Sequence, residues 1–148
     1  MLAAPDAVKD GSPGLVRPAR STSFLRVSDP SRSRFLGDLR KRAYAKRHSA
    51  DLVKLATLFQ TDKWGTHSYA PHYQHHFAPM RRRPLTVLEI GVGGHDNTSA
   101  GGESLRMWKA YFSRSQIVGI DLYDKTAVDE PRIRTFQAAR PTARFSRV

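Results

Sequence analysis

The chain has 148 residues, no cysteine, and 25 Lys and Arg against 13 Asp and Glu, which give a formal net charge of +12. This length allows at most one domain of ordinary size. The lack of cysteine excludes a disulfide framework, a thiolate zinc site and a thiol nucleophile. The most apolar stretch, residues 85–92, is too short for a membrane-spanning helix, so we expect no membrane segment.

The N-terminus does not fit a secretory signal. Asp6, Lys9 and Asp10 stand where such a signal needs an apolar run. Export is therefore disfavoured, and we expect a cytoplasmic protein. The Arg- and Ser-rich composition of the first residues leaves an organelle transit peptide as a weaker alternative.

The excess positive charge lies at the two ends of the chain. Residues 1–50 carry a net charge of +7 and residues 131–148 carry +5, whereas residues 51–130 are neutral. A basic protein invites the hypothesis of nucleic-acid binding. Because the excess lies outside the apolar middle of the chain, where no nucleic-acid module is recognisable, we consider this hypothesis an alternative only.

Residues 1–48 are predicted to form a basic arm. Its first part is rich in Pro, Ser and Gly and cannot bury enough apolar surface to fold, so residues 1–33 are expected to be disordered. Residues 34–46 allow a short basic amphipathic helix, with the apolar side chains of Leu36, Leu39 and Ala43 on one face.

Residues 49–84 are predicted to be a helical segment. Apolar residues at helical spacing indicate a helix over 50–59 with Ser49 as its N-cap. A second helix is expected over 72–78, with Pro71 in its first turn.

Three histidines fall in the second of these helices, at positions 72, 75 and 76, and the spacing brings two of them onto one face. Imidazole is a common metal ligand, but no carboxylate lies between Asp62 and Glu89 to complete a site. We therefore interpret them as surface or half-buried histidines and assign no metal site.

Residues 85–137 have the pattern of an α/β unit. Residues 85–90 and 116–122 read as buried parallel strands, with a helix over 103–112 between them and a third strand over 133–136. A glycine-rich turn follows the first strand, and the second strand ends in an acid. This pattern predicts one right-handed βαβ unit whose ligand lies outside the carboxyl ends of the strands.

The turn and the acid indicate which ligand fits. Gly91 and Gly93 let the backbone approach a ligand closely, and Asp121 can accept hydrogen bonds from a ribose diol. A dinucleotide fingerprint needs glycine at position 96, where this chain has Asp96, and no P-loop lysine follows the glycines. S-adenosylmethionine (SAM), which carries a ribose and a cation but no phosphate, is therefore the favoured ligand, and another nucleotide-binding βαβ protein remains the alternative.

Four short motifs are spaced along residues 52–137. They are Thr61-Asp62-Lys63 with Gly65, Tyr69 and Tyr73; Val87-Leu88-Glu89-Ile90-Gly91-Val92-Gly93; Gly101-Gly102-Glu103-Ser104-Leu105-Arg106-Met107-Trp108; and Val118-Gly119-Ile120-Asp121. The second motif resembles the first motif of class I SAM-dependent methyltransferases. The combination resembles the sugar O-methyltransferases of macrolide antibiotic biosynthesis, of the mycinamicin VI and demethylmacrocin type.

The resemblance implies a set of cofactor-binding residues. Those that would line the SAM site or hold its ribose are Glu89, Gly91, Gly93 and Asp121; those near its methionine end are Gly102 and Ser104; and those in a segment that closes over cofactor or substrate are Thr61, Lys63 and Tyr69. The interval from Gly93 to Asp121 is 28 residues, longer than in a compact nucleotide unit, and we interpret residues 95–100 as an inserted loop.

The same resemblance implies a fold of which this chain carries the N-terminal part. Family members continue to an adenine-binding acid, magnesium-binding carboxylates and a catalytic base, whereas residues 138–148 form an irregular basic tail without an acid, typical of a shifted reading frame. No catalytic residue and no magnesium ligand are therefore assigned. Half of a doubly wound sheet is expected to leave Leu88, Ile90 and Trp108 poorly covered.

The sequence thus predicts an α/β chain, the N-terminal part of a Rossmann-like methyltransferase sheet with a disordered basic arm. The expected function is that of a SAM-dependent sugar O-methyltransferase of a natural product, here truncated and inactive. Its acceptor would be a small molecule such as a glycosylated natural product, and a homo-oligomer is compatible with the sequence. The alternative is a small non-enzymatic protein that binds nucleic acid through its basic arms.

Overall fold

The computed structural model describes residues 30–139. Most of the predicted disordered arm and basic tail lies outside the described residues. In chain order the elements are α1 (Pro30–Arg47), α2 (Leu52–Phe59), α3 (Tyr69–Phe77), η1 (Ala78–Met80), β1 (Thr86–Ile90), α4 (Glu103–Tyr111), β2 (Gln116–Asp121), η2 (Thr126–Val128) and β3 (Ile133–Gln137). The predicted α/β unit is confirmed, with strand and α4 boundaries within one residue of those expected.

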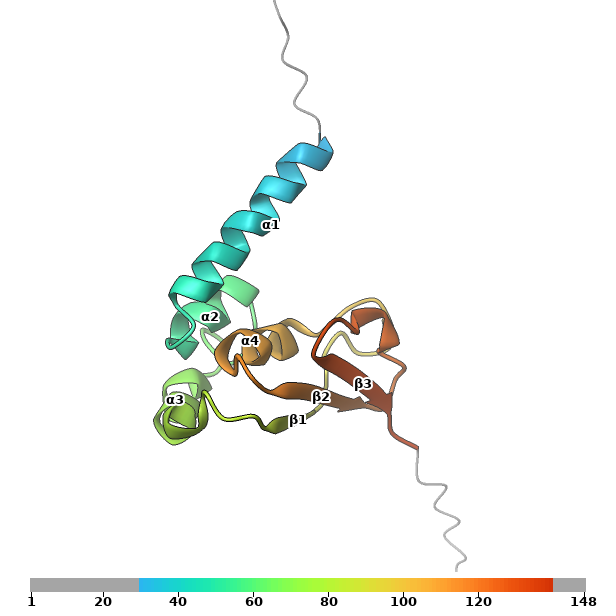
Figure 1. The fold of residues 1–148 in the computed structure, drawn as a ribbon. Helices are drawn as coiled ribbons and strands as arrows, with labels where there is room; N and C mark the ends of the chain where they lie inside the picture. Colours follow the sequence, from blue (N-terminus) through green and yellow to red (C-terminus); the bar gives the residue numbers. More distant parts are fainter. Residues whose placement is uncertain (1–29, 140–148) are drawn as a thin grey trace, which may run out of the picture.

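The strands form one parallel sheet in the order β1-β2-β3, and α4 lies over one of its faces (Figure 1). Side chains alternate across the sheet, so Ile117 and Ile133 are buried on the helix side. Gly119, two residues after Ile117 on β2, faces the same side of the sheet. A Cβ atom there would be 2.7 Å from the Val92 side chain and 3.0 Å from that of Leu105, so glycine permits the close packing of helix on sheet.

Trp108 of α4 is the centre of an aromatic cluster that joins α4 to α3. Its ring meets Tyr73 and Phe77 edge-on, with centroids 5.5 and 5.9 Å apart. Only 5% of Trp108 is exposed. The expectation that Trp108 is poorly covered is therefore wrong, because the aromatic side chains of α3 cover it.

The opposite face of the sheet carries exposed apolar side chains. Leu88 is 55% exposed, Ile90 83% and Phe136 59%. For Leu88 and Ile90 this is the outcome that the sequence predicts. In related folds both faces of a parallel sheet are covered, whereas in Figure 1 no described element lies beneath this one.

Helix α1 differs from the short amphipathic helix that was expected. It begins at Pro30, where a proline is compatible with the first turn of a helix, so residues 30–33 are helical and not disordered. Its apolar side chains are not gathered on a buried face: Phe35 is 62% exposed, Leu36 50% and Leu39 44%. The i+3 and i+4 spacing does place Leu36, Leu39 and Ala43 on one side of the helix, as expected, but that side is exposed, and the buried residue of α1, Ala45, lies on another side.

The next two helices also begin elsewhere than predicted. The N-cap of α2 is Asp51 and not Ser49, because residues 48–50 form a turn and the Asp51 carboxylate accepts the Lys54 N–H at 3.0 Å. Helix α3 begins at Tyr69, before Pro71, and buries Ala70. Pro71 is still within the first turn, where its missing N–H costs no hydrogen bond.

Candidate functional site

The glycine-rich turn leaves the sheet where β1 and β2 end. The Gly91 N–H donates to the Ile120 carbonyl at 2.8 Å, which continues the pairing of the two strands by one residue. Gly91 and Gly93 have φ angles of 88° and 86°, in the left-handed region that favours glycine. No atom lies within 4 Å of the position of a Cβ on Gly91. The backbone is therefore open there to a ligand.

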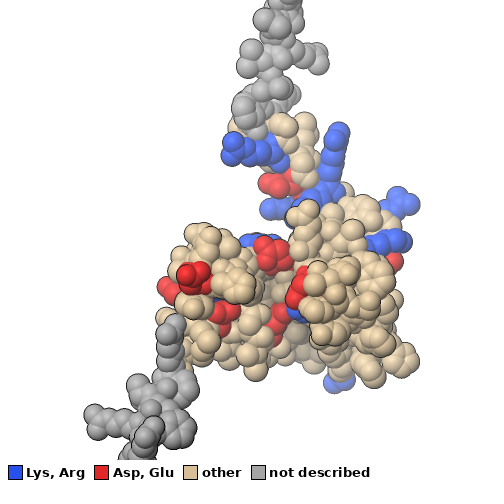
Figure 2. Space-filling view, turned by 180° about the vertical axis from the view of Figure 1, so that it is seen from behind, with Lys and Arg blue, Asp and Glu red and all other residues tan. Residues whose placement is uncertain are grey.

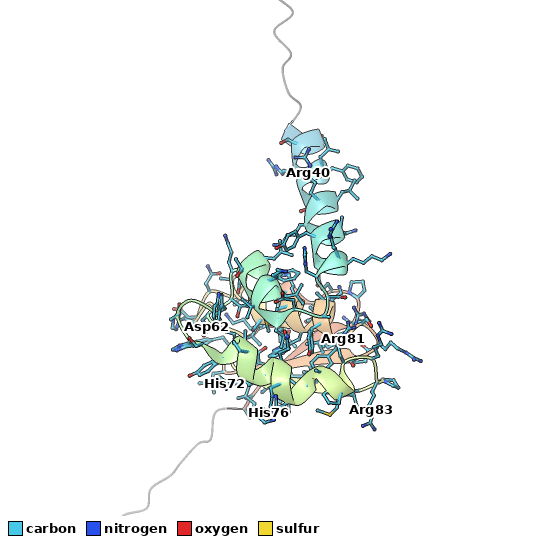
Figure 3. The ribbon with its side chains drawn as sticks, turned by 90° about the vertical axis from the view of Figure 1, so that its left-hand side faces the viewer. Arg40, Asp62, His72, His76, Arg81 and Arg83 are labelled. Carbon is cyan, nitrogen blue, oxygen red and sulfur yellow. The ribbon has the colours of Figure 1, made fainter. Side chains whose placement is uncertain are left out.

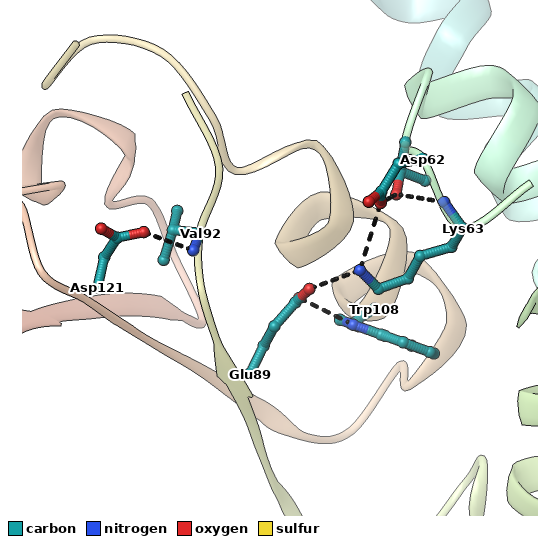
Figure 4. A network of polar contacts seen from close by, with 7 residues as sticks. Asp62, Lys63, Glu89, Val92, Trp108 and Asp121 are labelled. Carbon is teal, nitrogen blue, oxygen red and sulfur yellow. Dashed lines mark hydrogen bonds and ion pairs between the residues drawn. The ribbon is translucent and has the colours of Figure 1, made fainter. Parts of the chain in front are cut away.

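Asp121, the last residue of β2, is hydrogen-bonded to this turn. Its Oδ2 accepts the Val92 N–H at 2.8 Å (Figure 4), and its Oδ1 accepts the Tyr123 N–H at 3.1 Å. Burial raises the pKa of this carboxyl, but the two N–H groups and the nearby Lys125 ammonium outweigh burial and lower the pKa below its ordinary value. Asp121 is thus a carboxylate at neutral pH, and its remaining lone pairs can accept further donors.

Glu89, on β1, holds two other parts of the chain together. Its Oε1 lies 2.7 Å from the Lys63 Nζ, and its Oε2 accepts the Trp108 indole N–H at 3.0 Å (Figure 4). The side chains of Lys63 and Glu89 are 15% and 12% exposed. Burial lowers the pKa of Lys63, but the hydrogen bond and charge of Glu89 outweigh this and raise it. The pair therefore ties the segment before α3 to the first strand.

Within that segment, the three predicted residues have different environments. Thr61 is buried, and its hydroxyl accepts the Lys63 N–H at 3.3 Å. The Lys63 carbonyl accepts the N–H groups of Tyr69 and Ala70, which start α3. The Tyr69 ring is 47% exposed and stacks on His67 at 4.9 Å. Lys63 is thus the member of the three that touches the strand-end residue Glu89.

Gly102 and Ser104 lie at the entry to α4. Gly102 is the N-cap of the helix, with φ 82°, and its N–H donates to the Val92 carbonyl at 2.9 Å. Ser104 is 7% exposed. Together with Gly91, Gly93 and Asp121, these residues place a strand-end acid, an open backbone turn and a helix N-terminus at one edge of the sheet.

One residue that lies near this edge of the sheet was not identified from the sequence. Lys125, which follows β2, is 1% exposed, and its Nζ donates to three carbonyls of the 95–100 loop. It is a single lysine among acidic residues between β2 and β3, and no sequence motif marks a lysine with such contacts.

Other charged and metal-ligating side chains lie away from the strand ends. His72 and His76 lie on the outer side of α3 (Figure 3), and His75 is exposed as well. Within residues 30–139 no group of three His, Cys, Asp or Glu is placed to hold a metal ion. Lys and Arg gather around α1 in Figure 2. None of the described helices is both long and apolar enough to cross a bilayer.

Comparisons with known proteins agree with the resemblance predicted from the motifs. No protein-family model matches the chain. The 8-demethyl-8-alpha-L-rhamnosyl tetracenomycin-C 2'-O-methyltransferase of Streptomyces olivaceus is 53% identical over 87 residues, which are 59% of this chain and 23% of that protein. The mycinamicin VI 2''-O-methyltransferase of Micromonospora griseorubida is 49% identical over 96 residues, 64% of this chain and 24% of the relative. The chain thus spans about a quarter of the length of the curated relatives it matches.

The solved structures lead to the same group. The MycE methyltransferase of the mycinamycin biosynthetic pathway, in complex with Mg and S-adenosylhomocysteine (SAH), is similar with a TM-score of 0.58 and 50% identity. The match covers 60% of this chain and 23% of that structure. The sheet described above thus matches the N-terminal part of a Rossmann-like methyltransferase, and the relatives of the chain are sugar O-methyltransferases of natural-product pathways.

Proposed function

We propose that residues 85–137 form the SAM-binding part of an O-methyltransferase that acts on a sugar hydroxyl of a glycosylated natural product. The observation that carries the proposal is the hydrogen bond from the Val92 N–H to Asp121, 2.8 Å long. It joins the acid of β2 to the glycine turn of β1, in a chain 50% identical over the matched region to a methyltransferase solved with SAH. Its relatives are O-methyltransferases of tetracenomycin and mycinamicin substrates.

The residues at this edge suit SAM in charge and shape. Gly91 and Gly93 leave the backbone uncovered, so a ligand can lie against it. Asp121 carries a full negative charge, with capacity left for the two hydroxyls of a ribose. Asp96 in the adjoining loop disfavours a pyrophosphate. When bound, SAM supplies an electrophilic methyl group for transfer to a sugar oxygen.

The other predicted residues form the surroundings of this site in our proposal. Gly102 and Ser104, at the start of α4, lie toward the methionine end. Thr61, Lys63 and Tyr69 form the wall that closes over cofactor or substrate. Glu89 supports the site by positioning Lys63 and Trp108, because each of its two carboxylate oxygens is bonded to one of these side chains. We assign neither a magnesium ligand nor a catalytic base to residues 30–139.

Calorimetric titration of the full chain with SAH tests the proposal. Asp121→Asn should weaken SAH binding about tenfold or more, because a charge-assisted hydrogen bond to the ribose is lost. The matched control is Asp124→Asn, since Asp124 is an exposed carboxylate of the same connection, and it should leave the affinity unchanged. Equal affinities of the two variants, or no binding by the unaltered chain, would contradict the proposal.

A further inference from the structure

Lys125 is a buried lysine without a carboxylate partner. It is 1% exposed, and among the ion pairs of the described residues none includes it. Burying an ammonium group is costly unless each of its N–H groups finds an acceptor. A lysine retained in such a place therefore points to a specific set of acceptors.

The acceptors all belong to the loop between β1 and α4. The Lys125 Nζ lies 2.7 Å from the His95 carbonyl, 2.8 Å from that of Asn97 and 3.3 Å from that of Ala100. An ammonium has three N–H donors, so each can serve one carbonyl. The hydrogen-bond acceptors of the ammonium are thus peptide carbonyls of one short segment, and the Asp121 carboxylate is the nearby opposite charge.

Apart from its own local hydrogen bonds, this segment, residues 95–100, has little else to fix its conformation. It contains neither helix nor strand, and glycines with positive φ stand on both sides of it, Gly93 and Gly94 before and Gly101 and Gly102 after. Such a chain has many conformations in the absence of a tie. In the described part of the chain, the hydrogen bonds that reach residues 95–100 from another part of the molecule are those of Lys125.

Asp121 and Lys125 both hydrogen-bond to the backbone between β1 and α4, Asp121 as an acceptor and Lys125 as a donor. Asp121 accepts the Val92 N–H at the start of the glycine turn, while Lys125, four residues later, donates to carbonyls further along the loop. We call these two contacts the Asp121–Lys125 clamp. Because Asp121 ends β2 and Lys125 lies in the connection that follows, the clamp fixes the turn and its loop against the neighbouring strand.

We propose that Lys125 is a positioning residue of the cofactor site: its ammonium group holds the 95–100 loop and so fixes the backbone between Val92 and Gly102 for ligand binding. The proposal rests on the proposed function for its ligand. A neutral side chain at position 125 would leave three inward-facing carbonyls without a donor, and the loop would then open to find water.

The test compares Lys125→Met with Lys109→Met in the full chain. Lys109 is a suitable control because its Nζ pairs with Glu130 at 3.0 Å and does not contact the loop. Amide hydrogen exchange without ligand reports on the loop directly, since the Asn97 N–H is hydrogen-bonded to the Gly94 carbonyl and the Ala100 N–H to that of Asn97. Titration with SAH reports on the site.

In Lys125→Met we expect the amides of residues 95–100 to exchange about tenfold faster or more, with the strand amides unchanged. SAH should bind about tenfold more weakly. Lys109→Met should alter neither. If Lys125→Met does not fold, Lys125→Gln, which keeps two N–H donors without a charge, is judged by the same two measurements.

Three results would overturn the inference: unchanged exchange in the loop, an equal acceleration in loop and strands, or a faster loop with unaltered SAH affinity. The two proposals can fail separately. If the unaltered chain binds no SAH, the proposed function is refuted and the cofactor role of Lys125 falls with it, whereas loop exchange still decides whether Lys125 fixes the loop.

Discussion

The ion pair between Lys63 and Glu89 gives the sharpest prediction of stability. Its atoms are 2.7 Å apart, and both side chains are largely buried, at 15% and 12% exposure. Lys63→Met removes the ammonium group and leaves the Glu89 carboxylate with the Trp108 indole N–H as its side-chain donor. The variant thus breaks one side of a network that joins the segment before α3 to β1.

The expected cost follows from the type of bond and its burial. A hydrogen bond to a charged group contributes about 1.5–3 kcal/mol, and breaking a fully buried pair costs about 3–5 kcal/mol. Because both side chains keep some contact with water, we expect Lys63→Met to lower the free energy of unfolding by about 2–3 kcal/mol. Adding Glu89→Gln should restore part of this, since the amide oxygen can still accept from Trp108 and no unpaired charge remains.

Urea unfolding followed by tryptophan fluorescence measures these differences. The control is Lys54→Met, because Lys54 pairs with Asp51 at the surface, where the side chains are 49% and 37% exposed. Such a pair contributes about 1 kcal/mol at most. The reasoning is refuted if Lys63→Met costs no more than Lys54→Met, or if the double variant is less stable than Lys63→Met alone.

Four further predictions concern stability and surface. Tyr111→Phe should raise the free energy of unfolding by about 1 kcal/mol, because the buried hydroxyl has no hydrogen-bond partner among the described residues; chemical denaturation checks this. Gly119→Ala should cost about 1–3 kcal/mol through the 2.7 Å contact of its Cβ, whereas Gly37→Ala, inside α1 with open space around it, should raise the free energy of unfolding by up to about 1 kcal/mol in the same assay. Because the pKa of Asp121 is lower in the folded than in the unfolded chain, its ionisation stabilises the fold fully above about pH 4, and this stabilisation is lost as the pH falls through the folded-state pKa. Asp121→Asn should therefore make the free energy of unfolding, measured by urea unfolding, depend less on pH in the acid range. The exposed sheet face should bind the dye ANS, and Ile90→Thr should reduce its fluorescence because Ile90 is 83% exposed.

The strands and α4 could be predicted because their signals are local. A continuous apolar run followed by glycine indicates a buried parallel strand, and this pattern found β1 and β2 to within one residue. The candidate site followed from the same pattern, since the carboxyl ends of parallel strands meet at one edge. Gly91, Gly93 and Asp121 could therefore be placed together from the sequence.

The errors have their origin in contacts between distant parts of the chain. Trp108 was expected to be poorly covered, but Tyr73 and Phe77 of α3 cover it. The acceptors of Lys125 lie 25 to 30 residues before it, and no periodicity relates such positions. The N-cap of α2 was misplaced because Ser49 and Asp51 are both good capping residues, and the turn at 48–50 decides between them.

The central claim is that a SAM-type ligand binds at the carboxyl ends of β1 and β2. Titration of the isotope-labelled full chain with SAH, followed by amide NMR spectra, tests it most directly. The account predicts saturable shifts centred on the amides of residues 91–93, 102–104 and 121–123. Saturable shifts confined to other parts of the chain, or no shifts up to about 1 mM SAH, would contradict it.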